Sequence, residues 1–319
     1  MNPKVSIVVP VYNGEETIYC SLESVIKQTY KNLEVIVIDD GSRDNTKEIV
    51  LEYVKKDRRI QYFYQDNQGV SFARNSGILK ASGKYIGFLD SDDLYEKEFV
   101  EHMVRKIEKN SNDVCYCGYN NILSGKIKKN RTKFTTKQVL KNYILGKTSI
   151  HTTGWLISKE LLVKREIIFP IGISWGEDFE FFCEVLACAN SIVCVPEYLT
   201  NYTANYSTNQ LSAFSMDKLQ KDVDSIQRLQ SNPRVNNSKI INKALVDYRL
   251  SALIIYRLII AFKSNIDIDS IIINFNRYKT LIPRFSYNNG FRSFKLNITR
   301  IRLSCKIQYL KIKRCVKNL

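Results

Sequence analysis

The run Asp90-Ser91-Asp92-Asp93 offers the residue types and the spacing in this sequence that are best suited to chemistry. Carboxylates that alternate along a tight turn supply oxygen ligands for a hard divalent cation such as Mg²⁺ or Mn²⁺, which often shares its other ligands with phosphate oxygens. The same run would also suit the start of a helix near Glu96, because aspartate side chains cap helix N-termini. The run alone is therefore weak evidence for a metal site.

Polar or acidic residues follow each of four short apolar runs, at residues 5–9, 35–38, 60–64 and 85–89. Segments between these runs carry apolar residues at helical spacing, which predicts strands alternating with helices in a parallel sheet. Ligands bind beyond the carboxyl ends of such strands, so we expect the polar residues there to converge on one site. Those residues are Pro10, Val11, Tyr12 and Asn13, then Asp39, Asp40, Gly41 and Ser42, then Asp66 and Asn67, and finally the run at 90–93.

The elements that must position this site form a predicted α/β unit that is doubly wound and ends near residue 118. Continuous rather than alternating hydrophobicity in the first two runs is typical of strands covered on both faces. Asn13 precedes the first helical pattern, and Glu16 lies three residues after Asn13. This spacing predicts a capping box at the start of that helix.

The remaining chain divides by composition into two further regions, residues 119–214 and 215–319. Residues 119–149 are rich in Lys, Asn and Thr, and we expect a mobile connection or a loop on the acceptor side. After residue 215 the pattern is helical, and after Pro283 it fits either strands or a basic amphipathic helix, of which we favour the helix. Residues 250–262 are apolar but contain Arg257 and are too short to cross a bilayer, so we expect a buried or interfacial helix.

Four blocks of the sequence, in order, resemble those of the family 2 glycosyltransferases, which are inverting enzymes of the GT-A fold. The blocks are VSIVVPVYNGEETI, SVIKQTYKNLEVIVIDDGSRDNT, QGVSFARNSGILKASGKYIGFLDSDD and WGEDFEFF. The resemblance covers residues 4–118 closely and 150–210 more loosely. It implies the nucleotide-diphospho-sugar transferase fold, with a mostly parallel Rossmann-like sheet in which residues 1–118 bind the nucleotide sugar and 119–214 face the acceptor. It also implies a role in bacterial capsule, lipopolysaccharide or other surface-glycan synthesis.

The resemblance implies a role for each matching position. The implied donor is most often a UDP-sugar. Its base would be held by Pro10, Val11, Tyr12 and Asp40. Arg74 would lie beside the donor, and Asp90 and Ser91 would contact the ribose or the diphosphate. Asp92 would bind the Mn²⁺ or Mg²⁺ cofactor, and Asp178 would be the catalytic base that deprotonates a glycan or lipid-linked glycan acceptor. Residues 202–207 read YTANYS, which lacks the basic residue that relatives commonly carry there.

A structural role also fits three of these positions. Asp40 suits a D-G-S turn, Arg74 suits an ion pair with a nearby carboxylate, and Asp178 suits a helix cap. The bound metal would offset the charge that grows on the leaving diphosphate, and Asp178 would accept the proton of the attacking hydroxyl. Attack opposite the leaving group turns an α-linked donor into a β-linked product.

Charge is distributed unevenly along the chain. The formal net charge is +16, yet no Asp or Glu follows Asp269, while twelve Lys and Arg residues lie between Arg277 and Lys317. Such a segment is either a solvated basic helix or a surface that attracts anionic lipid, nucleic acid or an acidic substrate. We expect peripheral attachment to the inner face of the cell membrane, with no nucleic-acid partner. Scattered cysteines and the lack of a signal-peptide pattern at the start predict a cytoplasmic location.

Three other functions compete with glycosyl transfer. A nucleotidyltransferase would commonly carry a Gly-rich basic loop after the first strand, where PVYNGEE has one Gly and no cation. A sugar dehydrogenase would carry G-x-G-x-x-G at that place. A catalytically silent protein that binds membranes or polyanions would have lost a key carboxylate, but Asp40, Asp90, Asp92 and Asp178 are all present.

Overall fold

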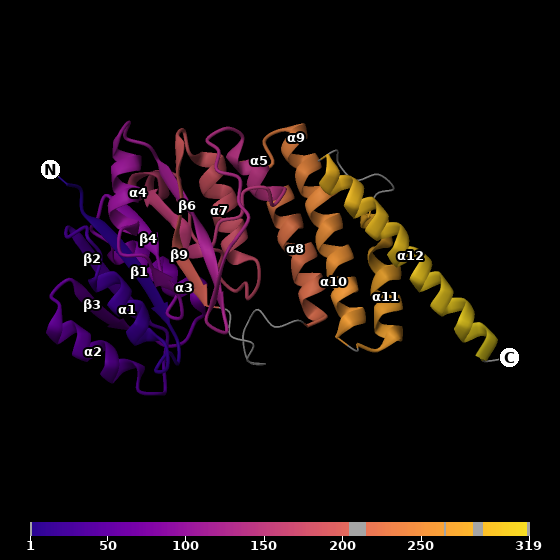
Figure 1. The fold of residues 1–319 in the computed structure, drawn as a ribbon, viewed down its shortest axis with the longest axis horizontal. Helices are drawn as coiled ribbons and strands as arrows, with labels where there is room; N and C mark the ends of the chain where they lie inside the picture. The colour runs from indigo at the N-terminus through magenta and orange to yellow at the C-terminus, as the bar shows by residue number, and fades with distance from the viewer. Residues whose placement is uncertain (1, 204–214, 265, 283–289, 318–319) are drawn as a thin grey trace. The chain divides into compact units, whose positions relative to one another are not determined.

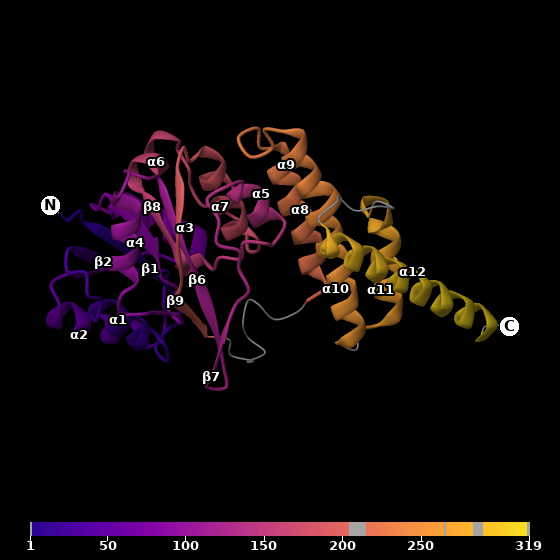
Figure 2. The ribbon, with the colours of Figure 1, turned by 45° about the horizontal axis from the view of Figure 1, so that its top comes forward.

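The computed structural model describes residues 2–203, 215–264, 266–282 and 290–317. The chain divides into two compact units, Met1–Ser207 and Thr208–Leu319. Figures 1 and 2 show a sheet with surrounding helices in the first unit and helices alone in the second. The predicted boundary between 214 and 215 lies at the edge of residues 204–214, which are outside the described part.

The described part of the first unit holds a nine-stranded sheet in which β1, β2, β3 and β4 run parallel. This arrangement confirms the predicted mixed α/β fold with a mostly parallel sheet. Strand β8 pairs antiparallel with β4 and β6, β5 pairs antiparallel with β9, and β7 extends from β6. In sheet order the strands are β3 (Ile60–Tyr64), β2 (Leu33–Asp39), β1 (Val5–Val11), β4 (Tyr85–Phe88), β8 (Trp155–Ser158), β6 (Val114–Leu123), β9 (Ile192–Thr203) and β5 (Leu94–Tyr95), with β7 (Lys126–Lys129) beside β6.

Helices cover both faces of β1, as its unbroken hydrophobicity predicts. Val5, Ile7 and Val9 belong to the core shared with α1 (Ile18–Ile26) and α4 (Phe99–Glu108). Val8 points to the other face, since successive side chains of a strand alternate, and meets α3 (Val70–Lys80). A Cβ at Gly77 of α3 would lie 2.2 Å from a methyl of Val8. This glycine therefore lets α3 lie close against the strand, with the first residues of α3 beside the candidate site.

The loop between β1 and α1 differs from the predicted capping box, which is wrong. Helix α1 begins at Ile18, and its N-cap, Thr17, makes no side-chain cap hydrogen bond. Asn13 has a φ of 50°, in the left-handed region, and its side-chain oxygen accepts a hydrogen bond from the backbone N–H of Arg43 at 2.9 Å. The Asn13 side chain thus ties this loop to the loop that precedes α2 (Thr46–Lys56) instead of capping α1.

Residues 119–149 contain regular elements, although their composition predicts a connection or a loop. Strand β6 runs through residues 118 and 119, so both predicted halves of the first unit share one sheet. Hairpin pairing continues β6 into β7, and the short helix α5 (Val139–Ile144) follows. The elements that lead to the second acidic motif are η1 (Thr152–Gly154), β8, α6 (Lys159–Lys164) and α7 (Glu177–Cys188).

The second unit is helical where it is described, in agreement with the predicted helical C-terminal region. Residues 291–317 form one long helix, which confirms the helical interpretation of that segment. Arg257 of the apolar helix α10 (Ser251–Lys263) donates a 2.7 Å hydrogen bond to Asp222, so this helix carries a partly buried ion pair. No helix within the described ranges is long and apolar enough to span a bilayer. The elements are α8 (Asp217–Ser231), α9 (Lys239–Lys243), η2 (Ala244–Leu250), α10 (Ser251–Lys263), α11 (Ile268–Tyr278), η3 (Lys279–Leu281) and α12 (Phe291–Lys317).

Candidate active site

The acidic run forms a tight turn between β4 and β5. The backbone N–H of Asp93 donates to the carbonyl of Asp90 at 3.0 Å, which closes the turn. Ser21 of α1 donates its hydroxyl to the carbonyl of Asp93 at 2.8 Å, which holds the turn against that helix. Strand β5 follows the run, so the alternative interpretation of the run as a helix cap is wrong. The turn lies at the carboxyl end of β4, at the sheet edge that the sequence predicts for a site.

Arg74 joins this turn to the start of α7. Its guanidinium donates to a carboxylate oxygen of Asp90 at 2.7 Å and lies 3.7 Å from a carboxylate oxygen of Glu177. These distances confirm the predicted ion pair of Arg74 with a nearby carboxylate. The arginine is 5% exposed, whereas the Asp90 side chain is 24% exposed. Burial disfavours the charged form of Asp90, but the charge of Arg74, the nearby His151 and the hydrogen bond from Arg74 together outweigh burial and hold the pKa of that carboxyl below its usual value.

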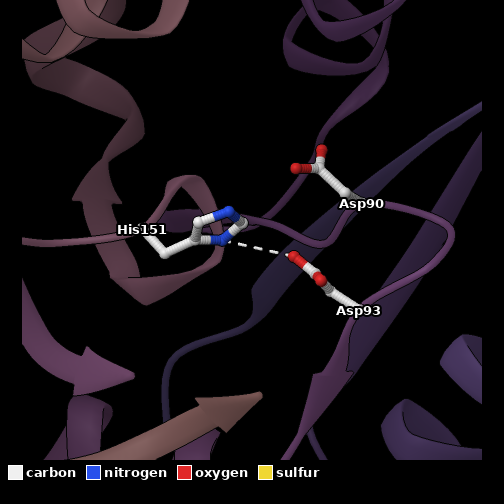
Figure 3. A group of neighbouring side chains, drawn as sticks. All are labelled: Asp90, Asp93 and His151. Carbon is white, nitrogen blue, oxygen red and sulfur yellow. Dashed lines mark ion pairs between the residues drawn. The ribbon is translucent and has the colours of Figure 1, made fainter. Parts of the chain in front are cut away.

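His151 faces the same turn from the segment before η1, as Figure 3 shows. Its Nδ1 lies 3.2 Å from an oxygen of Asp93 and 3.0 Å from the hydroxyl of Thr153. Burial lowers the pKa of His151. Burial and the negative charges of Asp90 and Asp92 raise the pKa of Asp93 well above its usual value. The sequence predicted no role for His151, and it predicted a role for Asp93 only as a member of the acidic run.

Ligand atoms of Asp90, Asp93 and His151 lie within 4.8 Å of one another. Two carboxylates and an imidazole can hold a divalent cation, and oxygen ligands suit Mn²⁺ and Mg²⁺. One carboxylate oxygen of Asp93, a residue that is 1% exposed, is buried without a hydrogen-bond partner in the described structure, although it faces the His151 ring. A buried carboxylate oxygen that accepts no hydrogen bond is suited to bind a cation.

Asp92, which the resemblance assigns to the metal, stands outside that three-residue group but on the same turn. Burial, with the added effect of the Asp90 charge, raises the pKa of Asp92 to about 6. A nearby cation would favour the charged form of Asp92. Ser91, between these two aspartates, lies against Gly14, where a Cβ would come within 3.6 Å of the serine hydroxyl.

Asp178 lies in the first turn of α7, two residues after the N-cap, Gly176. The hydroxyl of Thr152 donates to one of its carboxylate oxygens at 3.3 Å, and the N–H of Phe179 donates to the other at 2.6 Å. Asp178 therefore does not occupy the cap position itself, although its side chain bonds to a backbone N–H of the first turn. Thr152 directly follows His151, which faces the acidic turn, so the contact with Thr152 connects Asp178 to the segment that faces this turn.

The loops after β1 and β2 hold the other predicted donor-binding residues. Pro10 and Val11 are buried at the end of β1, whereas Tyr12 is half-exposed. Asp40 is buried and accepts hydrogen bonds from the side chain of Gln65 and from the backbone N–H groups of residues 68 and 69. Its carboxylate thereby shapes the loop before α3. The D-G-S turn is instead held by Asp39, which accepts from the N–H of Ser42 at 2.8 Å.

A pair of hydrogen bonds that sequence reasoning missed fixes the distance between α3 and the approach to α7. The side-chain amide of Asn75 donates to the carbonyl of Phe169 and accepts from its N–H, both at 2.8 Å. The Phe169 ring stacks on Phe181 of α7 at 3.7 Å between centroids and lies 5.1 Å from the Arg74 guanidinium. Asn75 thus keeps its neighbour Arg74 within reach of both acidic motifs.

Solved structures with this fold include S. aureus TarS 1-349 in complex with UDP-GlcNAc, with a TM-score of 0.70 and 21% identity over 88% of this chain and 82% of that one. The mannosyltransferase PcManGT from Pyrobaculum calidifontis, in complex with GDP-Man and Mn²⁺, has a TM-score of 0.58 and 16% identity over 98% and 88% of the two chains. At these identities the similarity establishes the fold, and it confirms the predicted GT-A architecture.

Relatives in sequence include the uncharacterized glycosyltransferase EpsJ of Bacillus subtilis, 32% identical over 64% of this chain and 62% of EpsJ. Glycosyltransferase GlyA of Streptococcus pneumoniae is 43% identical over 37% of this chain, and that match spans 17% of GlyA. The uncharacterized glycosyltransferase RT0329 of Rickettsia typhi is 32% identical over 67% of this chain and 70% of its own length. The family model described as glycosyl transferase family 2 matches residues 6–168, which carry the strands of the sheet up to β8, the acidic turn and Arg74. The chain therefore belongs to glycosyl transferase family 2.

Proposed function

We propose that this protein transfers a sugar from a nucleotide-sugar donor, of the UDP-sugar class, to an acceptor hydroxyl with inversion, in the synthesis of a bacterial surface glycan. The observation that carries the proposal is that two separate sets of side-chain contacts connect the acidic turn with the start of α7. Arg74 contacts both Asp90 and Glu177, while the consecutive residues His151 and Thr152 contact Asp93 and Asp178 respectively. A group that binds the leaving diphosphate and a candidate base are thereby held in one site.

The role that we propose for each side chain follows from its surroundings. Tyr12, half-exposed after β1, and the loop shaped by Asp40 would receive the nucleotide base. The Asp90–Arg74 pair would stand beside the diphosphate. Asp178 would accept the proton of the acceptor hydroxyl as that oxygen attacks the anomeric carbon from the face opposite the diphosphate. This geometry of attack is what inverts the anomeric centre.

The donor class draws support from the fold neighbours. TarS binds UDP-GlcNAc and PcManGT binds GDP-Man with Mn²⁺, so the same fold accepts a nucleotide sugar in both proteins. The relatives EpsJ, GlyA and RT0329 are glycosyltransferases by name. The acceptor that we propose is a growing glycan or a lipid-linked glycan.

The residues of the turn fit a divalent cation. Asp92 and Asp90 would hold it through carboxylate oxygens, with the unsatisfied oxygen of Asp93 and the ring of His151 beside them. A bound Mn²⁺ or Mg²⁺ would supply electrostatic stabilisation of the negative charge on the leaving diphosphate. Carboxylate ligands must be charged to bind, so protonation of Asp92, with its pKa of about 6, would oppose metal binding in mildly acidic solution.

The metal assignment makes a direct prediction for Asp92→Asn. This variant should bind Mn²⁺ about tenfold or more weakly and should lose affinity for the nucleotide sugar at the same time, because the acidic turn would hold a cation whose charge favours binding of the diphosphate. Excess chelator should abolish transfer by the wild-type protein. Isothermal titration with Mn²⁺ alone and with the donor measures both affinities.

The control for this measurement is Glu52→Gln, which removes one negative charge from an exposed position on α2. Its Mn²⁺ affinity should stay at the wild-type value. Undiminished transfer in excess chelator, or equal Mn²⁺ binding by Asp92→Asn and wild-type protein, would contradict the metal assignment.

A further inference from the structure

Helix α12 carries two rows of apolar side chains, and one of these rows is buried within the described part of its unit. Leu296, Leu303 and Ile307 are buried and follow one another at helical spacing. On the opposite side lies a second apolar row, which we name the outer stripe. Its members are Phe294, Ile301, Tyr309 and Ile312, with exposed fractions of 61%, 54%, 62% and 58%. Cys305, also exposed, lies within the same row.

The outer stripe runs along one side of the helix. Steps of seven, eight and three residues separate its members, and at 3.6 residues per turn each of these steps returns close to the same side. Exposed apolar side chains in a continuous row differ from the isolated ones that are normal on a protein surface, and they mark a surface with a partner.

Basic residues accompany the stripe, and α12 has no acidic residue. Nine of its 27 residues are Lys or Arg. Lys295 and Arg302 are exposed on one flank of the stripe. On the other flank Lys311 donates a 3.0 Å hydrogen bond to Asn276 of α11, which keeps its ammonium group beside the stripe. Two such helices would repel each other, so the charge argues against a second copy of this chain as the partner.

A cavity of about 620 Å³ opens beside the middle of the stripe. Its lining combines apolar side chains with cations and hydroxyl groups, which suits a molecule with an apolar part and an anionic part. The lining residues include Phe275 and Ile282 from the side of α11 and η3, and Arg300, Ile301, Ser304 and Cys305 from α12.

We propose that α12 lies in the plane of an anionic lipid surface, with the outer stripe inserted among the acyl chains and the flanking cations at the headgroup phosphates. A helix with an apolar face and basic flanks binds at such an interface without crossing it. A soluble polyanion would be attracted by the cations alone and would leave the stripe in water, so the stripe favours the lipid surface. The inference rests on the second unit and is independent of the proposed sugar transfer.

The test measures partition of the full chain onto vesicles of phosphatidylcholine and onto vesicles of phosphatidylcholine mixed with phosphatidylglycerol, by sedimentation. The double variant Ile301→Ser/Ile312→Ser should bind the anionic vesicles about tenfold or more weakly than wild type. Its control is Val163→Ser/Ile240→Ser, which removes two similarly exposed apolar side chains from α6 and α9. The control should bind like wild type.

A charge pair completes the test. Lys295→Glu/Arg302→Glu should also lose about tenfold or more of its binding, whereas Lys126→Glu/Lys128→Glu, with the same change in net charge on β7, should retain it. Equal wild-type binding to neutral and anionic vesicles would overturn the proposal. If the charge variant loses binding to anionic vesicles and Ile301→Ser/Ile312→Ser does not, the result would overturn the proposal and would favour a soluble polyanion as the partner. A wild-type dimer that this serine variant dissociates would overturn it in favour of a second copy.

Discussion

Asp178→Asn is expected to lower the rate of sugar transfer by about a hundredfold or more while leaving the affinity for the nucleotide sugar unchanged. The amide keeps the shape of the side chain and can still accept a hydrogen bond from Thr152 or from the N–H of Phe179, but it cannot take a proton from the acceptor hydroxyl. Asp40, Asp90 and Asp92, which we propose to bind the donor and its cation, are unchanged in this variant. Single-turnover transfer rates and donor titrations, measured on the same preparations, separate the two effects.

Glu177, the residue before Asp178, is a useful comparison, although its substitution should itself have some effect. Glu177 lies 3.7 Å from Arg74, and burial with the charge of Asp178 raises its pKa to about 7. Glu177→Gln should therefore cost less transfer than Asp178→Asn, with some change in stability. The silent control is Glu160→Gln on the surface of α6. A near wild-type rate for Asp178→Asn, or a loss of rate matched by lost donor binding and a lower melting temperature, would reject Asp178 as the base.

Arg74→Met is expected to destabilise the first unit by about 3 to 5 kcal/mol, the usual cost of removing one partner from a buried ion pair. Methionine fills much of the volume but leaves the carboxylates of Asp90 and Glu177 without their shared cation. Asn75 and Phe169 would still hold α3 beside the approach to α7. The shift in the urea unfolding midpoint, followed by the fluorescence of Trp155 and Trp175, measures the loss.

The comparison for Arg74 is Lys164→Met, which breaks the exposed i,i+4 ion pair with Glu160 on α6. Exposed pairs of this kind contribute about 0.3 to 0.5 kcal/mol, so that midpoint should hardly move. Arg74→Lys should fall between the two, because one ammonium group cannot reach both carboxylates as the guanidinium does. Equal midpoints for Arg74→Met and Lys164→Met would show that water, rather than Arg74, stabilises the two carboxylates.

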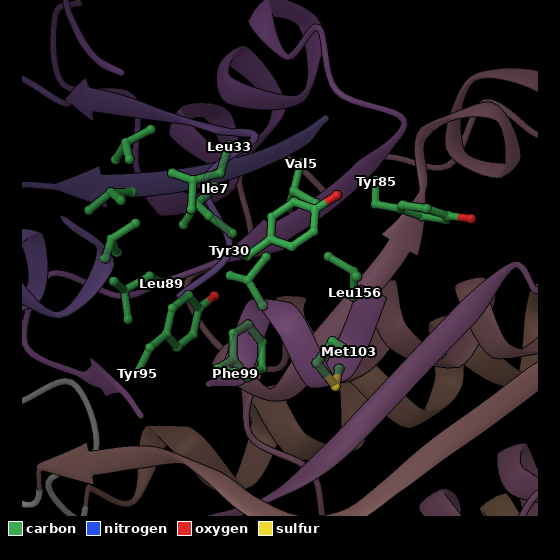
Figure 4. Close-up of a cluster of buried hydrophobic side chains, with 14 of the residues drawn as sticks. Val5, Ile7, Tyr30, Leu33, Tyr85, Leu89, Tyr95, Phe99, Met103 and Leu156 are labelled. Atoms are coloured by element: carbon green, nitrogen blue, oxygen red, sulfur yellow. The ribbon is translucent and has the colours of Figure 1, made fainter. Parts of the chain in front are cut away.

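Much of the first unit could be predicted from local patterns. The apolar runs at residues 5–9 and 85–89 read as buried strands because both of their faces are covered, and Figure 4 shows Val5, Ile7, Tyr85 and Leu89 within one cluster of buried side chains. Parallel order then placed the acidic run and Asp40 at the same edge of the sheet, which the structure bears out. For residues 291–317 the pattern fitted strands as well as a helix, and the structure confirms the helix that was favoured.

The contacts within the site could not be predicted, because they join segments that are distant in the sequence. His151 meets Asp93, 58 residues earlier in the chain, only because β8 pairs antiparallel with β4 and brings the preceding segment to the acidic turn. The amide of Asn75 meets the backbone of Phe169 across 94 residues. Neither an isolated histidine nor an asparagine inside a helix has a periodic signal. Asn13 misled the helix-start prediction because its side chain bonds across the loop to residue 43.

The measurement that tests the proposed sugar transfer most directly is a donor panel. The full chain is incubated with Mn²⁺ and each of a set of UDP-sugars and GDP-sugars, and binding and the slow release of free nucleoside diphosphate are recorded. We predict that one UDP-sugar binds saturably, is hydrolysed slowly without an acceptor, and is displaced by UDP, with Asp92→Asn losing both signals. A protein that neither binds nor hydrolyses any nucleotide sugar, and instead releases pyrophosphate from a nucleoside triphosphate and a sugar phosphate, would contradict the account.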